Sequence, residues 1–474
     1  MNAAERYMTL SGRRTMALYR AVQYASWTIP ATIMRTVAHD IGQVNHDWQG
    51  VGSRGTIHLV NKLMEVMFPS KMPFFKLAVQ EDDKKDYVIG SESIELELAR
   101  LETLAIDKMN SSNLRSKLQE LLILLVISGD GVLKVDLEEG CTVYQLAEYV
   151  KTLSPSGRLN ELIIEEKIYW HSLPEDLQKQ LMNYENGLEP VKIYTWVKRK
   201  GKKYTAHQEI IEIGKIGATG TYTEDTLPWI CCYWRLVNKE NYGRGLIELH
   251  AGDFASLSNT AESIAVMTAI LADFKHLVSS KCASDVQDLL KLPTGGYTPG
   301  EKDDVTTLWT DVSKAIEVLT AAADKIERRL GAVFLLNSAV TRDKERVTAE
   351  EIRVQVAELE AALGGVYSSL GNALQRPLAT RLLGSIDTRT SKLKMTVLTG
   401  LESLSRTNEI ARWSQLLTML ATMANTPPEA MDWINFGKLV KVLSAGFGLD
   451  YNKVLNSEEE VKAVRAERLA SNQP

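Results

Sequence analysis

Apolar residues repeat at helical spacing in three long segments in the second half of the chain. From Glu248 to Ala272 they recur three, four and seven positions apart, with no proline and no glycine after Gly252, which predicts one long helix. These residues are Phe254, Leu257, Ala261, Ile264 and Leu271. A second segment alternates spacings of four and three, which predicts a helix with a narrow packing seam. Its seam residues are Val312, Ile316, Leu319, Ala323, Ile326, Leu330 and Val333.

The third helical segment begins at Thr348, whose hydroxyl can bond the amide of Glu351 while the Glu351 carboxylate reaches back, a capping box. Its apolar positions carry a helix to about Gln375, where Pro377 is expected to bend or stop it. These positions are Ile352, Val356, Leu359, Leu363, Val366, Leu370 and Leu374. The polar loop between the second and third helices is NSAVTRDKERV, from Asn337 to Val347.

A turn-rich stretch separates the first two long helices. Leu292 to Asp304 reads LPTGGYTPGEKDD, and its prolines and glycines cannot continue a helix, so we expect a small β-containing excursion there. The chain therefore leaves the first helix and comes back into the second.

The first 245 or so residues mix helical with alternating patterns. VGSRGTIHLVNKLMEVMF, from Val51, has apolar residues at helical spacing, whereas KIYTWVKRKGKKYTAHQEIIEI predicts two strands joined by a turn around Gly201. This half is therefore predicted to be α+β. The turn carries Lys198, Arg199, Lys200, Lys202 and Lys203. A phosphate-binding tip is one interpretation of these cations, and a solvated hairpin end is the simpler one.

Beyond Gly400 the chain is again helical, with a break at Pro427 and Pro428 and a second capping box formed by Ser457 and Glu460. We expect a small helical unit at this end.

The composition is that of an ordinary globular protein: 474 residues, 45% hydrophobic and 24% charged. The longest apolar run, LLILLVI from Leu121 to Ile127, is far shorter than the roughly 20 residues of a membrane span. The N-terminus lacks the apolar stretch and cleavage site of a signal peptide, so we expect the protein to stay in the cytoplasm in which it is made. The four cysteines include no C-x-x-C pair, and we expect free, buried thiols.

The formal net charge is −5, so the chain lacks the electropositive excess of a protein that grips nucleic acid by its phosphates. Between Glu248 and Leu308 nine acids face four lysines, which places the whole excess in the first long helix and the excursion after it. A surface with this excess of acids repels the phosphates of nucleic acid. Contact with neighbouring subunits is an alternative role for the same charges.

Patterns for enzyme chemistry are missing. The glycine clusters GATG, from Gly217, and SGDG, from Ser128, lack the lysine and hydroxyl of a phosphate loop. The seven histidines do not fall at metal-ligand spacing, and there is no G-x-S-x-G. Acids between Glu81 and Asp86 alternate with Lys84 and Lys85, which favours a solvated loop over a metal site. We expect no catalytic residues, no metal and no cofactor.

The stretch from Arg328 to Leu383 resembles portal proteins, also called head-to-tail connectors, of short-tailed bacteriophages (podoviruses). LNSAV, ERVTAEEI and LGGVYS are its most distinctive parts. Further similar segments follow in the same order along the chain: YASWTIP at Tyr24, VGSRG with LVNKLMEVMFP at Val51, LPED at Leu173, NYGRG at Asn241 and TGLESLSR at Thr399. The resemblance thus covers nearly the whole length.

The resemblance implies a portal-protein fold of the α+β class, with an α+β wing, a long antiparallel helical stem, a small β-containing clip and a C-terminal helical crown. On this plan residues 1–247 and 348–399 form the wing, 248–274 and 312–336 the two stem helices, 275–311 the clip, 337–347 the tunnel loop and 400–474 the crown. The stem helices carry small residues that permit close packing in a ring, although an ordinary helical bundle explains them too. These are Ala261, Ala265, Ala269, Ala315, Ala322 and Ala323.

The resemblance also implies a homo-dodecamer at the capsid portal vertex of the virion, assembled in the host cytoplasm. This ring would act as a passive DNA channel for genome packaging and ejection. Partners would be double-stranded DNA, the large terminase ATPase, the tail adaptor, and the major capsid and scaffolding proteins, with no membrane. Tunnel-loop residues near DNA would be Asn337, Arg342, Lys344 and Arg346. Clip residues that contact terminase or adaptor would be Tyr297, Glu301, Lys302, Asp303 and Asp304. A tail-tube or head-tail adaptor ring is the alternative function.

Overall fold

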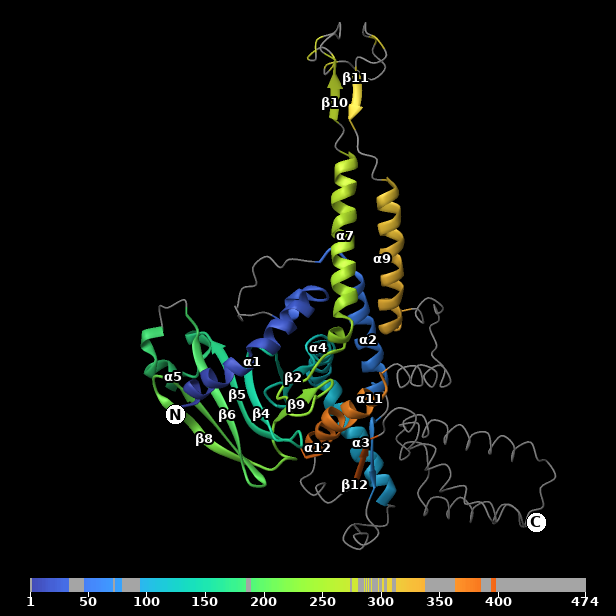
Figure 1. Cartoon of the computed structure of the whole chain (residues 1–474). Helices are drawn as coiled ribbons and strands as arrows, with labels where there is room; N and C mark the ends of the chain where they lie inside the picture. The colour runs from blue at the N-terminus through green and yellow to red at the C-terminus, as the bar shows by residue number, and fades with distance from the viewer. Residues whose placement is uncertain are drawn as a thin grey trace, which may run out of the picture.

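The computed structural model describes residues 2–33, 47–70, 73–78, 94–184, 189–272, 275–279, 305–308, 313–336, 363–384 and 394–397, with single residues at 285, 287, 289, 291, 297 and 301. Figure 1 shows a body of helices and sheets from which two long helices project side by side, with a two-stranded sheet beyond their far end. The predicted α+β class is confirmed.

Helices α1 to α6 form much of the helical part of the body. They are α1 (Ala3–Ser26), α2 (Val51–Met67), α3 (Ile94–Ser111), α4 (Leu114–Ile127), α5 (Glu175–Gln180) and α6 (Leu246–Leu249). The predicted helix from Val51 is confirmed as α2, and its apolar spacing reflects burial except at Ile57, which is exposed. The apolar run LLILLVI forms the C-terminal half of α4 and is buried almost completely, so this run belongs to the core of the body.

The larger sheet is an antiparallel meander of five strands in sequence order. Its strands are β4 (Tyr149–Leu153), β5 (Leu159–Ile168), β6 (Val191–Lys200), β7 (Lys203–Ile210) and β8 (Gly214–Tyr222). The predicted hairpin around Gly201 is confirmed as β6 and β7, with Lys200 paired with Lys203. Helix α1 crosses one face of this sheet, where Tyr7 packs among Val150, Ile163 and Tyr194.

A second sheet has three strands in the order β3-β2-β9: β2 (Asp130–Lys134), β3 (Thr142–Tyr144) and β9 (Trp229–Tyr233). A separate strand pair joins β1 (Phe75–Ala78) to β12 (Lys394–Val397), so the last described strand returns to the segment that follows α2. The main hydrophobic core contains residues of α2, α4, both of these sheets and the bases of the two projecting helices.

The projecting hairpin consists of α7 (Ala251–Ala272) and α9 (Ser313–Val333), with β10 (Lys275–Val278) paired antiparallel to β11 (Val305–Leu308) at its far end. The predicted seam from Ile316 to Val333 lies within α9, where Ile326 and Leu330 are buried, and its first residue, Val312, lies outside the described residues. One prediction needs correction, because α6 ends and α7 starts around His250, so the helix does not run unbroken from Glu248. The helix within 312–336 also ends earlier than that range, at Val333, and the φ of 59° at Leu335 takes the chain out of the helix.

The last described helices are α11 (Gly365–Leu370), a π-helical segment η6 (Gly371–Gln375) and α12 (Arg376–Gly384). The prediction of an unbroken helix to Gln375 is wrong at Gly364, which has a φ of 52° and precedes α11. Pro377 does not stop the helix either, because the π-helical segment η6 runs directly into α12, whose second residue is Pro377. The capping box at Thr348, the acids from Glu81 to Asp86 and the C-terminal unit lie outside the described residues.

Candidate functional site

The base of the α7/α9 hairpin is anchored in the body by aromatic side chains. Phe254 of α7 stacks on Trp27 with ring centroids 6.2 Å apart, and it meets Phe334 edge-on at 6.1 Å. Both phenylalanines are buried in the main core. Gly55 of α2 lies against Phe334, so closely that a methyl group there would lie 2.4 Å from the ring atom Cδ2. The hairpin is therefore held firmly at the body.

Two ion pairs lie around this base. Arg329 of α9 reaches Asp253 of α7 at 2.7 Å, and Arg54 of α2 reaches Glu327 of α9 at 2.9 Å. All four side chains are substantially exposed, so each pair adds at most about 1 kcal/mol of stability. Their effect is on alignment: they link α7, α9 and α2 at one level of the hairpin.

The upper half of α7 is uncovered. Val266 and Ile270 are 50% and 54% exposed, and Val318 on α9 is 69% exposed. Between Glu262 and Ala272, α7 carries no charged residue on any side. Among the described residues, α7 from Ala251 to Leu271 has the length and composition to cross a membrane, and only 17% of its most apolar stretch is buried. This surface needs a covering partner that the described part of the subunit does not supply.

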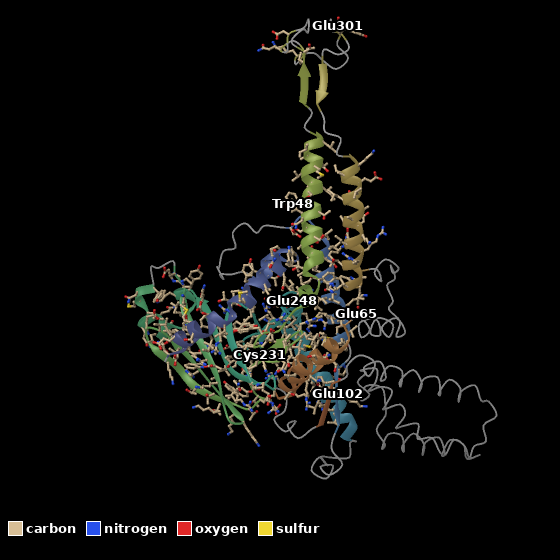
Figure 2. The ribbon with its side chains drawn as sticks, viewed as in Figure 1. Trp48, Glu65, Glu102, Cys231, Glu248 and Glu301 are labelled. Atoms are coloured by element: carbon tan, nitrogen blue, oxygen red, sulfur yellow. The ribbon has the colours of Figure 1, made fainter. Side chains whose placement is uncertain are left out.

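The far end of the hairpin holds two of the predicted clip residues. Tyr297 is 99% exposed and Glu301 is also exposed, and Figure 2 shows Glu301 at the far end of the hairpin with Glu248 near its base. Lys302, Asp303 and Asp304 lie outside the described residues. The β10–β11 pairing brings together chain segments on both sides of the predicted excursion.

The predicted tunnel-loop residues Asn337, Arg342, Lys344 and Arg346 also lie outside the described residues. The chain on both sides of residues 337–362 is nevertheless fixed. Phe334 and Leu335 before this segment and Leu363 after it are buried in the main core. Any loop between these positions starts and ends at defined points of the body.

The thiols of Cys141 and Cys232 are buried, and that of Cys231 is half-buried. Cys141, Cys231 and Cys232 are free, and burial raises the pKa of the Cys231 thiol to about 11 and that of Cys232 further. Nucleophilic or metal-binding cysteines need the opposite, a thiolate near neutral pH. Among the described residues no three His, Cys, Asp or Glu side chains come together as a metal site would require.

The sequence patterns missed a buried polar cluster between the two sheets. Asp130 accepts hydrogen bonds from the Tyr149 hydroxyl, from Nζ of Lys151 and from the amide of Gly243. Asp130 lies in SGDG, the glycine cluster that lacks the lysine and hydroxyl of a phosphate loop. Gly243 lies in NYGRG, one of the segments that resemble portal proteins. No periodic signal marks the cluster, because its members come from separate strands and a loop.

A comparison with protein families matches residues 1–455 to the family described as "Bacteriophage head to tail connecting protein". The chain is 30% identical to the portal protein of Enterobacteria phage T3, a similarity that covers 97% of this chain and 89% of that protein. It is 29% identical to the portal protein of Escherichia phage T7 over 98% of this chain and 89% of that protein. For the portal protein of Pseudomonas phage phiKMV the identity is 28%, over 94% and 90% of the two chains.

Among solved structures, the chain is similar to a protein in the neck of an empty GTA particle computed with C6 symmetry, with a TM-score of 0.38 and 12% identity over 85% of this chain and 90% of that chain. A neck structure of the native GTA particle computed with C12 symmetry gives a TM-score of 0.35 and 11% identity over 84% and 90% of the two chains.

Proposed function

Because the chain belongs to the family of bacteriophage head-to-tail connecting proteins, we propose that it assembles into a closed homo-dodecameric ring whose central channel carries double-stranded DNA. Its place is the junction between phage head and tail, as a component of the virion. In the proposed role the ring is the portal vertex, assembled in the host cytoplasm, through which the genome enters during packaging and leaves during ejection. The relatives are named portal proteins, which favours this role over that of a tail-tube or adaptor ring.

The observation that carries the ring is the uncovered upper half of α7. Helix α9 covers only one side of α7, and the exposed residues Val266 and Ile270 carry no charge to keep them in water. Small residues at Ala261, Ala265 and Ala269 allow another helix to approach closely. A ring with cyclic symmetry uses two different faces of each subunit, and a helix that is apolar on several sides meets that need.

A lipid bilayer is the other environment that covers an apolar helix, and α9 argues against it. Helix α9 packs along α7, so a membrane crossing by α7 would bring α9 into the hydrocarbon as well. Its seven charged residues are Lys314, Glu317, Asp324, Lys325, Glu327, Arg328 and Arg329. Burying so many charges in lipid costs at least about 2.5 kcal/mol for each at the bilayer centre.

We assign the parts of the subunit by the family's plan. Residues 1–247 and 348–399 form the wing, an assignment supported by the pairing of β12 with β1. The helices within 248–274 and 312–336 form the stem, 275–311 the clip, 337–347 the tunnel loop, and 400–474 the crown. The clip, with Tyr297 and Glu301 exposed, docks the large terminase and later the tail adaptor. The outer parts of the ring meet the major capsid and scaffolding proteins.

In this role the subunit performs no chemistry, and a separate ATPase drives the DNA. Purified protein should form closed rings with a central hole in negative-stain images, without detergent. Monomers or dimers alone across a range of salt and pH would contradict the proposal, and rings that form only in detergent would favour a membrane role. An ATPase assay on the rings should give no hydrolysis above the buffer rate.

A further inference from the structure

A cluster of cations lies at one end of the five-stranded sheet. The turn between β4 and β5 and the turn between β6 and β7 lie at the same end, because Glu161 of β5 pairs with Lys198 of β6. Together the turns present six cationic residues, which we call the basic tip: Arg158, Lys198, Arg199, Lys200, Lys202 and Lys203. The whole chain has a net charge of −5, so this concentration of positive charge runs against its overall balance.

The charges of the basic tip are not neutralised within the described part of the subunit. Five of its six side chains are exposed, Arg199 is half-buried, and among the described residues none of the six forms an ion pair. The guanidinium of Arg199 donates to the carbonyl of Gly201, which holds it beside the turn. The cations of the two turns repel one another, and an anionic partner relieves that repulsion.

Of the acids near the basic tip, Glu161 is already engaged, and Glu224 and Asp225 lie within the electrostatic reach of another cation. Glu161 accepts from Arg6 at 2.7 Å and from the indole nitrogen of Trp196 at 3.0 Å, and its side chain is almost fully buried. Glu224 and Asp225, in the loop after β8, interact electrostatically with Arg381. The positive charge of the tip therefore stays available at the surface.

The tip also has a shape and a rigid support. An open concavity of about 370 Å³ is lined by Thr152, Asn160, Glu161, Lys198, Arg199 and Gly201. Hydroxyl, amide and cationic groups are the side chains that contact phosphate oxygens. The two-residue turn begins at Gly201 with a φ of 64°, and paired strands hold it on both sides, so little conformational entropy is lost on binding.

The kind of partner follows from what is missing around the tip. A protein interface has an apolar or aromatic centre, and single-stranded nucleic acid stacks its bases on exposed aromatic rings. Among the described residues, no large exposed hydrophobic side chain belongs to either turn, and Lys198 lies over the nearby indole of Trp196. Contacts to the backbone of a duplex need cations and polar groups alone.

We propose that the basic tip binds the phosphate backbone of double-stranded DNA on the outside of the subunit, without reading its sequence. This site is separate from any contact in the channel and does not depend on ring formation. It would hold DNA that lies against the body of the protein rather than DNA that passes along the stem.

The test uses relaxed circular duplex DNA, which has no end to thread through a ring and so reports on outer surfaces. The variant Lys198→Gln/Lys200→Gln/Lys202→Gln removes three charges from the tip. A matched control, Lys179→Gln/Lys192→Gln/Lys215→Gln, removes three exposed charges at or near the opposite end of the same sheet. Full-length proteins are compared by gel shift over a series of salt concentrations, after circular dichroism has established that each is folded.

We expect the tip variant to bind at least tenfold more weakly at low salt. The slope of log affinity against log salt should fall by about 2 to 3, close to 0.9 for each phosphate that the variant no longer neutralises. The control should match the wild type. Equal binding by the tip variant and the wild type would overturn the proposal. A poly-glutamate peptide provides the second arm: loss of peptide binding with unchanged DNA binding would identify an acidic protein as the partner and overturn the DNA site.

Discussion

The Nζ atom of Lys151 lies 2.7 Å from Oδ1 of Asp130, and neither side chain is exposed to solvent. Burial lowers the pKa of Lys151, but the Asp130 carboxylate outweighs it and the pKa ends above its ordinary value, so the ammonium group stays charged at neutral pH. The other Oδ atom of Asp130 accepts from the amide of Gly243 at 2.6 Å. One buried carboxylate thus joins β2, β4 and the segment before α6.

Replacing Lys151 by methionine should destabilise the subunit by about 3–5 kcal/mol, because the buried carboxylate of Asp130 loses its counter-ion. The midpoint of urea unfolding measures this loss. Lys192→Met, at an exposed position on the same sheet, should change the stability by less than about 0.5 kcal/mol. A Lys151→Met protein within about 1 kcal/mol of the wild type would show that the pair does not hold the two sheets together.

Glu148 makes the stability of the body depend on pH. Burial raises the pKa of its carboxyl group to about 7, against the lowering effect of the Gln145 amide, and Glu166 and Glu120 raise it while Lys167 lowers it. The folded state therefore keeps a proton that the unfolded chain loses near pH 4.5. Because the folded state binds more protons between these values, the free energy of unfolding falls as the pH rises from about 4.5 to about 7.

Glu148→Gln removes this titration and keeps a carbonyl oxygen to accept from Gln145. The variant should match the wild type near pH 4.5 and exceed it by about 1–3 kcal/mol at pH 8. Urea unfolding at both pH values gives the comparison, with Glu138→Gln, in an exposed turn, as the control. A difference that is the same at both pH values would rule out titration of Glu148 as its cause.

Two glycines in helices should respond in opposite ways to alanine. At Gly55 an added methyl group would meet the Phe334 ring, at 2.4 Å from Cδ2 and 2.6 Å from Cγ, so Gly55→Ala should cost about 1–3 kcal/mol by pushing α9 away from α2. At Gly12 in α1 an added methyl group meets nothing within 4 Å, so Gly12→Ala should stabilise by about 0.5–1 kcal/mol. Thermal unfolding of both variants tests the pair, and equal effects would mean that α2 and α9 have room to separate.

Sequence periodicity predicted those helices that bury one face and expose the other. Ile326 and Leu330 are buried toward the body and repeat on one side of α9, so the seam was visible in the sequence. The breaks at His250 and Gly364 were not predicted, because they depend on where the chain turns in three dimensions. Ile57 shows the opposite error, an apolar residue at the right spacing that nevertheless faces solvent.

For the candidate sites, too, some features could be predicted from the sequence and others depend on the fold. Sequence pattern predicted the hairpin around Gly201, but whether its lysines are free of acids depends on where Glu161 and Glu224 lie, which only the fold determines. Asp130 and Lys151 are 21 residues apart on different sheets, and no spacing rule connects them. Sequence pattern predicted a turn-rich excursion and a polar loop, but their roles as clip and tunnel loop came from the resemblance alone.

Val266→Asp should prevent ring assembly without unfolding the subunit. Val266 is 50% exposed in the subunit, so a carboxylate there is hydrated, whereas in the proposed ring it would be buried without a counter-ion. Size-exclusion chromatography with light scattering, together with negative-stain images, should show monomers or small oligomers. The control Ser172→Asp adds the same charge at an exposed position of the body and should still form rings. Normal rings from Val266→Asp would place the upper half of α7 outside the subunit interface.

Neutralising the tunnel loop should separate assembly from DNA handling. Arg342, Lys344 and Arg346 stand against Asp343 and Glu345, a net charge of +1, so in the proposed role the loop would make weak and transient phosphate contacts rather than a firm grip. The buried Phe334, Leu335 and Leu363 fix the chain on both sides of this loop, so replacing the three cations by glutamine should leave ring formation unchanged.

Phage that carry this triple variant should yield fewer DNA-filled heads, or heads that lose DNA after filling, because the channel no longer slows DNA at the loop. The Lys179→Gln/Lys192→Gln/Lys215→Gln protein removes the same number of charges from exposed positions of the body and should package normally. Counting filled and empty heads by electron microscopy, and measuring nuclease-protected DNA for each head, separates a filling defect from a retention defect. Normal filling and retention by the loop variant would mean that these three residues do not contact the passing DNA.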